Sequence, residues 1–597
     1  MLSHSSPLRG QIRGFLRLDA GDCPGARGPF RTVPWNQGVG HWLSWSCLAA
    51  ILVAFLLHLR FMSPVGYFGV CPDDAVYFSS AKALAQGHGY IIASFPGGPP
   101  QTKYPVLYPW LLSWIWRFYP SFPANIVPAA WITAFFTCWF LAAAFELLRR
   151  LAGVGDWTAL AIVSLCAFEP HVLVLSRCLL SDVPFAALAL TAAVVGDRAM
   201  QERARPAFTL LAGVVAALSV MTRTIGVAVA AGIVAAALHR RAYRKAALFL
   251  LVAAPWVLVS MWAGHPALTP AEAGSPWQAG TSALALPGWQ QSLLYYTNYG
   301  AFWRLCVPSL GVFGAMLAGN LALWVKGMAV YLFSPTLQIE KSLAGNAIGG
   351  IVSAGAVAGI LRQARSDGWK PIHFIIPFYF AVVLIWNFPI LDRFFLPFLP
   401  LFYMGLWVEG KHLVHLALSA YRDRRPLGER VVCGITLAVL ATLSGVAIWN
   451  YRYGYRSEIA GQAEFRTRMW AEKAQAYDWI RRNTGSGTRI IAYDDASLYL
   501  YAGRAAVRPI SFSTEYVYTR DMRVLERDLA HISDVACAIR AHFWLVSEDD
   551  FYSELQDAQP LMKARVAQRM SGLPEVYHSE RIQLYDISRL LQPAPSP

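Results

Sequence analysis

The sequence Trp42-Leu-Ser-Trp-Ser-Cys-Leu-Ala-Ala-Ile-Leu-Val-Ala-Phe-Leu-Leu-His-Leu-Arg-Phe61 decides the fold class. About 20 predominantly apolar residues are enough for a helix to cross the hydrocarbon core of a bilayer. Comparable runs recur at Ile126–Leu148, Ala246–Trp262 and Val431–Trp449. The first run is long and lacks a small-residue cleavage site, so we read it as an anchor and not as a signal peptide. The pattern predicts a multi-pass, all-α membrane bundle.

The composition supports a membrane protein and argues against a nucleic-acid-binding one. Of 597 residues, 56% are hydrophobic and 15% are charged, whereas soluble proteins carry about 25% charged residues. The net charge is +15. The basic residues gather in short segments between apolar runs, at 149–150, 198–205, 240–245, 362–370 and 411–430. This is the positive-inside pattern, so the net positive charge reflects which loops face the cytoplasm.

The topology divides the chain into three parts. Residues 1–41 are predicted to form a disordered cytoplasmic tail, and residues 42–450 a transmembrane region of about 11–13 spans with a first outer loop at 63–105. Residues 264–300 and everything after Trp449 are expected outside. Segments 105–119 and 301–342 leave the span count open. The first of these is short and has proline near both ends, which favours a re-entrant or interfacial segment over a full span.

Residues 451–597 are predicted to form a small extracytoplasmic α/β domain. Phe465–Thr484 has helical spacing, and three short apolar runs follow at 489–493, 506–510 and 542–546. An amphipathic stretch, Met522–Arg540, separates the second run from the third. Alternation of helical and strand patterns is typical of α/β domains. The chain has no nucleotide-binding glycine motif.

The first outer loop carries Asp73-Asp74-Ala-Val-Tyr77, then Gly87-His-Gly89-Tyr90 and Thr102-Lys103-Tyr104-Pro105. Charge beside hydrocarbon must be hydrated, paired or used. Two adjacent carboxylates ionise less readily together, so one is expected to have a raised pKa and to act as a base. The alternative interpretation is that they cap a helix over Ala75–Leu84.

The residues around this pair have ordinary explanations as well. Tyr77 and Tyr104 are aromatics of the kind that form interfacial belts. Lys103 is either a lysine that extends its charge to the membrane surface or a ligand for a lipid phosphate.

Further charges are predicted on the same outer face. Arg177 and Asp182 lie in Ser-Arg-Cys-Leu-Leu-Ser-Asp-Val-Pro, Arg223 in Met-Thr-Arg-Thr, and Arg393 precedes Phe-Phe-Leu-Pro. A helix cap remains the alternative for Asp182, and membrane anchoring the alternative for Arg223. Acid beside base at one lipid boundary suits a reaction in which a base activates an acceptor and cations receive a phosphate leaving group.

Neither Glu169-Pro170-His171 nor the pair His412 and His415 is read as a metal site, and both are assigned to local structure. No cofactor is specified, and a divalent cation remains an open alternative.

The motifs together resemble the GT-C glycosyltransferases that use polyprenyl-phosphate-linked sugars. The resemblance is to the bacterial branch similar to protein O-mannosyltransferases and to lipid A aminoarabinose and galacturonic acid transferases. It covers most of the membrane region. It is carried by the acidic loop, by Gly87-x-Gly89-Tyr90, Tyr104-Pro-x-Leu-Tyr-Pro109, Leu180-Ser-Asp182-Val-Pro184, Thr222-Arg-Thr and Arg393-Phe-x-x-Pro397-x-x-Pro400. In the outer domain, Trp479-Ile-Arg-x-Asn-Thr484 and Leu498-Tyr-Leu-Tyr-x-Gly-Arg504 also look like bacterial members.

The resemblance implies a hexosyl- or pentosyltransferase with Asp73 as the general base and inversion at the anomeric carbon. Lys103, with Arg393 or Arg223, would stabilise the polyprenyl phosphate, while Asp74 and Asp182 would orient substrate or bind a cation. Aminoarabinose transferases often have an acid directly before the lysine. The run here is Gln101-Thr-Lys-Tyr-Pro105, which weakens the case for a metal site.

The expected partners are a polyprenyl-phosphate sugar donor, membrane lipids and an acceptor that is a glycan, a lipid or a protein, with no nucleic acid. The expected location is a bacterial-type inner membrane. The rival functions are a transporter and a non-catalytic scaffold that binds prenyl lipids. Transporters place ionisable residues near the bilayer midplane and often have internal repeats, whereas the charges here lie at span ends.

Overall fold

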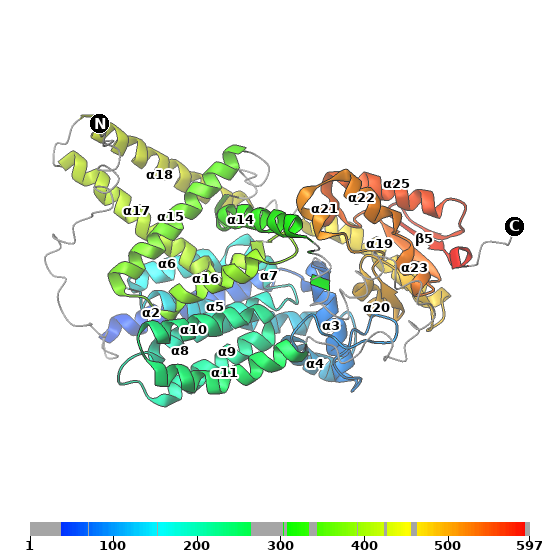
Figure 1. Cartoon of the computed structure of the whole chain (residues 1–597), viewed down its shortest axis with the longest axis horizontal. Helices are drawn as coiled ribbons and strands as arrows, with labels where there is room; N and C mark the ends of the chain where they lie inside the picture. Colours follow the sequence, from blue (N-terminus) through cyan, green and yellow to red (C-terminus); the bar gives the residue numbers. More distant parts are fainter. Residues whose placement is uncertain are drawn as a thin grey trace, which may run out of the picture. The chain divides into compact units, whose positions relative to one another are not determined.

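The computed structural model describes residues 38–69, 71–151, 153–263, 302–303, 307, 309–333, 343–390, 392–422, 427–454 and 462–591. The outer segment expected at 264–300 lies outside these residues, as does all of the predicted tail except its last four residues. The protein is predominantly helical up to Gly454, and a mixed sheet with its own helices follows from Gln462 (Figure 1).

The helices of the first part range in length from 6 residues in α7 to 28 residues in α18. Their bounds are α2 Gly38–Leu59, α3 Pro72–Ala85, α4 Leu107–Phe118, α5 Ile126–Leu148, α6 Asp156–Ala167, α7 Pro170–Leu175, α8 Asp182–Ala199, α9 Pro206–Thr222, α10 Val227–His239, α11 Tyr243–Ala263, α14 Leu310–Phe333, α15 Leu343–Asp367, α16 Pro371–Leu384, α17 Leu399–Arg422 and α18 Leu427–Gly454.

Five helices of the described part are long and apolar enough to cross a membrane: Trp42–Leu59, Ile126–Leu148, Leu310–Leu332, Leu343–Asp367 and Arg430–Asn450. Three of the four apolar runs singled out in the sequence are thereby confirmed, and the fourth, Ala246–Trp262, lies within the helix α11. The chain is a multi-pass membrane protein. The number of 11–13 spans stays a prediction.

The two ambiguous segments take different forms. Helix α4 has 12 residues and is about 18 Å long, too short to cross about 30 Å of hydrocarbon. This agrees with the interfacial interpretation of 105–119. Within 301–342 the structure describes one helix of crossing length, α14, whose Lys326 donates a hydrogen bond to Asn346 of α15 at 3.0 Å.

The bundle packs through neighbouring pairs. Helix α8 packs against α5 and α9, α9 against α11, and α10 against α16 (Figure 1). Helices α15 and α17 approach most closely, since a Cβ added at Gly359 would lie 1.9 Å from the carbonyl oxygen of Gly405. Small residues permit such contact between apolar helices.

The C-terminal domain has a five-stranded sheet in the order β2-β1-β3-β5-β4. Its strands are β1 Arg489–Ile491, β2 Ala505–Val507, β3 Phe543–Ser547, β4 Glu575–His578 and β5 Ile582–Asp586, and its main helices are α19 Gln462–Asn483, α20 Asp495–Ala502, α21 Thr514–Thr519, α22 Met522–Ala530, α23 Asp534–Ala538 and α25 Gln559–Met570. Strand β1 pairs in parallel with β2 and β3, while β5 pairs antiparallel with β3 and β4.

This domain confirms the predicted α/β architecture and corrects two details. The three apolar runs are the parallel strands, but β4 and β5 were not foreseen. Strand β4 is only half-buried or exposed, so its sequence lacks a continuous apolar run. The amphipathic stretch predicted as one unit over Met522–Arg540 is two helices, because the chain turns at residues 531–533.

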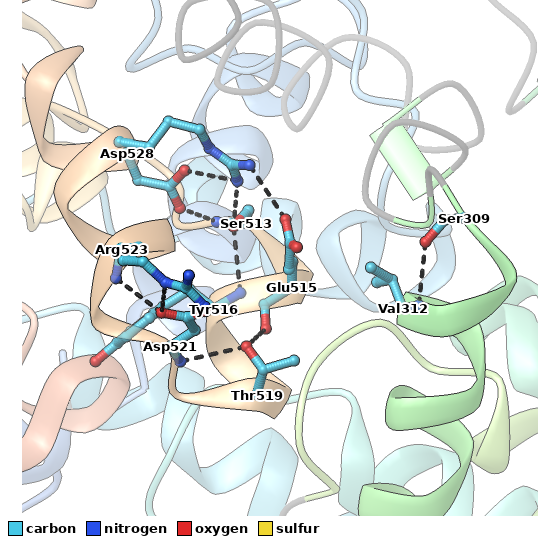
Figure 2. A network of polar contacts seen from close by, with 10 residues as sticks. Ser309, Val312, Ser513, Glu515, Tyr516, Thr519, Asp521, Arg523 and Asp528 are labelled. Carbon is cyan, nitrogen blue, oxygen red and sulfur yellow. Dashed lines mark hydrogen bonds and ion pairs between the residues drawn. The ribbon is translucent and has the colours of Figure 1, made fainter.

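Short polar contacts fix the orientation of α21 (Figure 2). The Ser513 hydroxyl accepts a hydrogen bond from the Tyr516 N–H at 3.3 Å, and Asp528 accepts one from the Ser513 N–H at 2.9 Å. On the following turn, the Asp521 carboxylate caps α22 and pairs with Arg523 at 2.9 Å. Figure 2 also shows Ser309, which accepts a hydrogen bond from the Val312 N–H at the start of α14.

Candidate functional site

The acidic pair lies in the first turn of α3. This helix begins at Pro72, with Cys71 as its N-cap and proline in the first position, where the fixed backbone angle favours a helix. The helix expected over Ala75–Leu84, capped by the carboxylates, therefore begins earlier than predicted. Both Asp74 oxygens instead accept the Gly69 N–H, at 3.1 and 3.0 Å. Asp74 is fully buried, so it holds the preceding loop.

Asp73 occupies a different environment from its neighbour. The Tyr104 hydroxyl donates a hydrogen bond to one carboxylate oxygen, and Arg393 donates to the other at 2.9 Å. Burial by itself raises the pKa of Asp73, but Arg393, Lys103 and the Tyr104 hydrogen bond outweigh it and hold the pKa well below the usual range. The expectation of a raised pKa is therefore wrong for Asp73, because cations surround it.

Arg393 connects Asp73 to a second acid. Its guanidinium lies 3.7 Å from Asp182, and Asp182 pairs with Arg223 at 2.5 Å. Asp182 is the first residue of α8 and its side chain is 4% exposed. Arg223 directly follows the last residue of α9, and its guanidinium lies 5.4 Å from the centre of the Phe394 ring. Two carboxylates and two guanidinium groups thus alternate along one chain of contacts, which we call the charge cluster.

Three tyrosines position the charge cluster on the side of the first outer loop. The Tyr77 hydroxyl is 2.7 Å from the Ser181 hydroxyl, and the Tyr77 and Tyr104 ring centres are 4.7 Å apart. The Tyr90 hydroxyl donates to the Tyr104 carbonyl at 2.9 Å. Gly87 and Gly89 have φ values of +78° and +85°, which glycine adopts at low cost. The Gly-x-Gly-Tyr motif therefore turns the chain so that Tyr90 reaches the segment carrying Tyr104.

Lys103 lies beside Asp73 in a small open cleft with about 20 Å³ of space for a water-sized molecule. The cleft is lined by Pro72, Asp73, Val76, Ile92, Gln101, Lys103, Tyr104, Asp495 and Arg508. The Lys103 ammonium lies 4.8 Å from the centre of the Tyr104 ring. Asp495 and Arg508 come from the C-terminal domain. Sequence reasoning missed them because only the sheet topology brings them to the first outer loop.

The structure does not bring Arg177 into the charge cluster. Its Nε donates to the Met62 carbonyl at 2.9 Å, and its guanidinium lies 5.1 Å from the centre of the Trp131 ring. Its side chain is almost fully buried there. These contacts describe a cation that ties together the segment after α2 and helix α5, and a role in substrate binding stays a prediction.

Within the described residues, no group of three histidine, cysteine or acidic side chains is arranged to hold a metal ion. Asp74 and Asp182, the two carboxylates considered for a cation, are engaged by the Gly69 N–H and by arginine respectively. Glu169 caps α7 by accepting the Val172 N–H at 2.9 Å and contacts His171 at 2.8 Å. This local arrangement agrees with the structural interpretation of that motif.

Comparison with solved structures identifies the fold. The chain is similar to the oligosaccharyltransferase AglB from Archaeoglobus fulgidus, in complex with an inhibitory peptide and a dolichol-phosphate, with 14% identity, a TM-score of 0.51, and coverage of 94% of this chain and 76% of that one. It is also similar to ArnT from Cupriavidus metallidurans bound to undecaprenyl phosphate, with 12% identity, a TM-score of 0.49, and coverage of 92% and 98%.

The likeness to AglB shows that the chain has the GT-C fold that the motifs led us to expect. At such low identity it defines the fold alone. No family model matches the chain, and no curated protein matches it.

Proposed function

We propose that this protein is an integral membrane glycosyltransferase. It transfers a sugar from a polyprenyl-phosphate-linked donor to an acceptor on the extracytoplasmic face. The observation that carries the proposal is the environment of Asp73: an ionised carboxylate at the wall of a cleft, with Arg393 and Lys103 beside it. In a GT-C fold, this environment supports a role for Asp73 in activating the acceptor beside cations suited to a phosphate.

The reaction is a single displacement. Asp73 accepts the proton of the acceptor hydroxyl, and the acceptor oxygen forms a bond to the anomeric carbon of the donor sugar. The bond between that carbon and the phosphate oxygen breaks, so the electron pair leaves with the polyprenyl phosphate. Attack from the face opposite the leaving group inverts the configuration. Lys103, with Arg393 or Arg223, stabilises the phosphate charge.

The low pKa of Asp73 shapes its role. The carboxylate is ionised in the physiological range, and its low pKa makes it a weak base that takes the proton only as the acceptor oxygen forms its bond to the anomeric carbon. An ionised carboxylate has about four lone-pair sites, and Tyr104 and Arg393 each engage one oxygen. We propose that an acceptor hydroxyl in the cleft uses one of the remaining sites. Asp182 acts as a positioning residue, because it holds Arg223 and stands close to Arg393.

The same proposal sets the orientation in the membrane. The charge cluster and the C-terminal domain lie on the extracytoplasmic side of a bacterial-type inner membrane, and the basic loops on the cytoplasmic side. The positive-inside distribution of arginine and lysine supports this orientation. The donor chain would then lie among the helices while its phosphate reaches Lys103.

The decisive experiment is a donor panel. Membranes containing the full chain are incubated with a set of polyprenyl-phosphate sugars, and consumption of each donor is followed. We expect one donor class to be consumed, and Asp73→Asn to reduce its consumption roughly 10²- to 10⁴-fold, the range for loss of a general base.

A matched control is Asp521→Asn, which makes the same chemical change in an arginine-paired carboxylate of the C-terminal domain. It should leave consumption unchanged. Consumption that persists at the wild-type rate in Asp73→Asn would remove Asp73 from the mechanism, and failure of every donor would refute the proposed substrate class.

A further inference from the structure

We infer that Lys103 and Arg508 together bind one oxyanion of the substrate in the cleft beside Asp73. The C-terminal domain thereby supplies a direct substrate contact. The ligand class is a phosphate-type anion, carried either by the polyprenyl phosphate or by the acceptor. The inference rests on the proposed function and names a binding residue that the acidic-loop motifs do not contain.

The cleft is built from two distant parts of the chain. Asp73, Val76, Lys103 and Tyr104 come from α3 and the first outer loop, and Asp495 and Arg508 come from the C-terminal domain. Asp495 follows strand β1, and Arg508 directly follows strand β2. These strands are parallel, so both residues lie at the carboxyl edge of the sheet. Ligands of open α/β sheets bind at that edge.

Arg508 is held in a defined orientation. Its Nε donates to the Tyr493 carbonyl at 3.1 Å, and its guanidinium lies 4.1 Å from the centre of the Tyr493 ring. One terminal nitrogen is 3.6 Å from a Glu554 oxygen, while the Tyr493 hydroxyl donates to Glu554 at 2.8 Å. A stacked guanidinium with a fixed Nε loses little further freedom on binding an anion.

The two walls of the cleft are joined to each other. The Ser94 carbonyl in the first outer loop accepts a hydrogen bond from the Ala506 N–H of β2 at 2.8 Å. Ile92 and Phe95 belong to the same buried cluster as Ile491 and Val507 of the sheet. The loop that carries Lys103 therefore packs directly on the strand that ends at Arg508, and this contact fixes the two cations relative to each other.

The charges of the cleft define the test. Beside Asp73 and its partner Arg393, the charged lining residues are Lys103, Arg508 and Asp495, and Arg508 also lies 3.6 Å from Glu554 outside the lining. An oxyanion is attracted by the two cations and repelled by Asp495. A neutral sugar hydroxyl, by contrast, would donate a hydrogen bond to Asp495.

The experiment measures binding of undecaprenyl phosphate to the purified full chain in detergent by isothermal titration calorimetry. We expect Arg508→Gln to weaken binding roughly tenfold to a hundredfold, as loss of a charge-assisted hydrogen bond does. Asp495→Asn should tighten binding, because it removes a repelling charge. Arg523→Gln is the matched control: its side chain is 91% exposed in the same domain, and it should change nothing.

A second titration distinguishes the source of the anion. Inorganic phosphate is added to protein saturated with undecaprenyl phosphate. If Arg508→Gln weakens only the first titration, the anion belongs to the donor; if it weakens only the second, the anion belongs to the acceptor. Unchanged affinity in both titrations, or weaker binding in Asp495→Asn, overturns the inference.

Folding and the proposed function are tested separately. Arg508→Lys keeps the charge and should recover part of the affinity. A purely structural defect in Arg508→Gln would also lower the unfolding temperature of the ligand-free protein. A loss of affinity matched by that lower temperature counts against the inference. If wild-type protein binds no undecaprenyl phosphate, the proposed donor class fails. If wild-type protein and Arg508→Gln bind it equally, only this inference fails.

Discussion

Asp182→Asn is the most direct perturbation of the charge cluster, because Asp182 is the acid that both arginines approach. Its carboxylate lies 2.5 Å from Arg223 and 3.7 Å from Arg393, and its side chain is 4% exposed. The substitution keeps the size and removes the charge. It leaves two guanidinium groups with Asp73 as the remaining carboxylate of the cluster.

The magnitude follows from burial. Removing one partner of a buried ion pair costs about 3–5 kcal/mol, because the other charge stays buried. Arg223 and Arg393 retain 16% and 14% exposure of their side chains, so water recovers part of this loss. We therefore expect Asp182→Asn to lower the free energy of unfolding by about 3 kcal/mol, at the lower end of the range.

The assay is a double-mutant cycle on the purified protein in detergent. Unfolding free energies are measured for Asp182→Asn, Arg223→Gln and the double variant. The double variant removes one charge of each sign and restores the balance. We expect it to be less destabilised than the sum of the single variants, by about 1–3 kcal/mol, the size of coupling between contacting residues.

The control is Asp478→Asn, which removes an acid paired with the exposed Arg481 and Arg482. Exposed pairs contribute about 0–1 kcal/mol, so this variant should be nearly neutral. Additive effects in the cycle, or an Asp182→Asn variant as stable as Asp478→Asn, would refute the reasoning that the four charges form one coupled network.

Three further outcomes follow from the site. Arg393→Gln removes the largest influence that lowers the pKa of Asp73. The effect of burial then dominates, so the acid limb of the pH profile of kcat/KM should move to higher pH. An acid limb that does not move would show that it does not report the titration of Asp73. Tyr104→Phe removes one hydrogen bond to Asp73 but keeps the ring beside Tyr77, and it should shift the same limb in the same direction by less. Tyr518→Phe removes hydrogen bonds to Asn320 and to the Trp386 carbonyl. It should speed hydrogen exchange at 384–398 more than at 90–105, and equal changes in both segments would contradict the contact's local role.

The membrane part could be predicted because its signal is local. The length and composition of a run such as Ile126–Leu148 predict a spanning helix, and no other part of the chain is needed for that prediction. The positive-inside pattern then assigns Asp73, Asp182, Arg223 and Arg393 to one face. Since these residues all lie at helix ends or in loops, adjacent helices bring them together, and their proximity follows from topology.

The residues alone do not predict the division of roles between Asp73 and Asp74, which only the family resemblance implied. Adjacent residues on an α-helix point about 100° apart, and the sequence does not say which one faces the cleft. That depends on where the helix begins, and the start at Pro72 is earlier than the carboxylate-capped start considered as the alternative. The same shift turns Asp74 towards the Gly69 N–H.

The low pKa of Asp73 has a related cause. The sequence places a second carboxylate directly beside it, which by itself favours protonation. Arg393 is 320 residues away along the chain and lies at 2.9 Å in the structure. A contact at such separation outweighs the sequence neighbour, because electrostatic interaction depends on distance in space. Lys103 acts in the same sense.

The C-terminal domain has a place in this electrostatic arrangement as well, because it contacts both halves of the site. On one side, Ala506 holds the loop that carries Lys103 through the Ser94 carbonyl. On the other, the Thr514 hydroxyl donates to the Asn387 carbonyl at 3.3 Å, in the segment that leads to Arg393. These two hydrogen bonds connect the domain to the segments that carry or adjoin Lys103 and Arg393. Arg393 is the strongest influence that lowers the pKa of Asp73, so the contacts of the C-terminal domain with these two segments also bear on the ionisation of the proposed base.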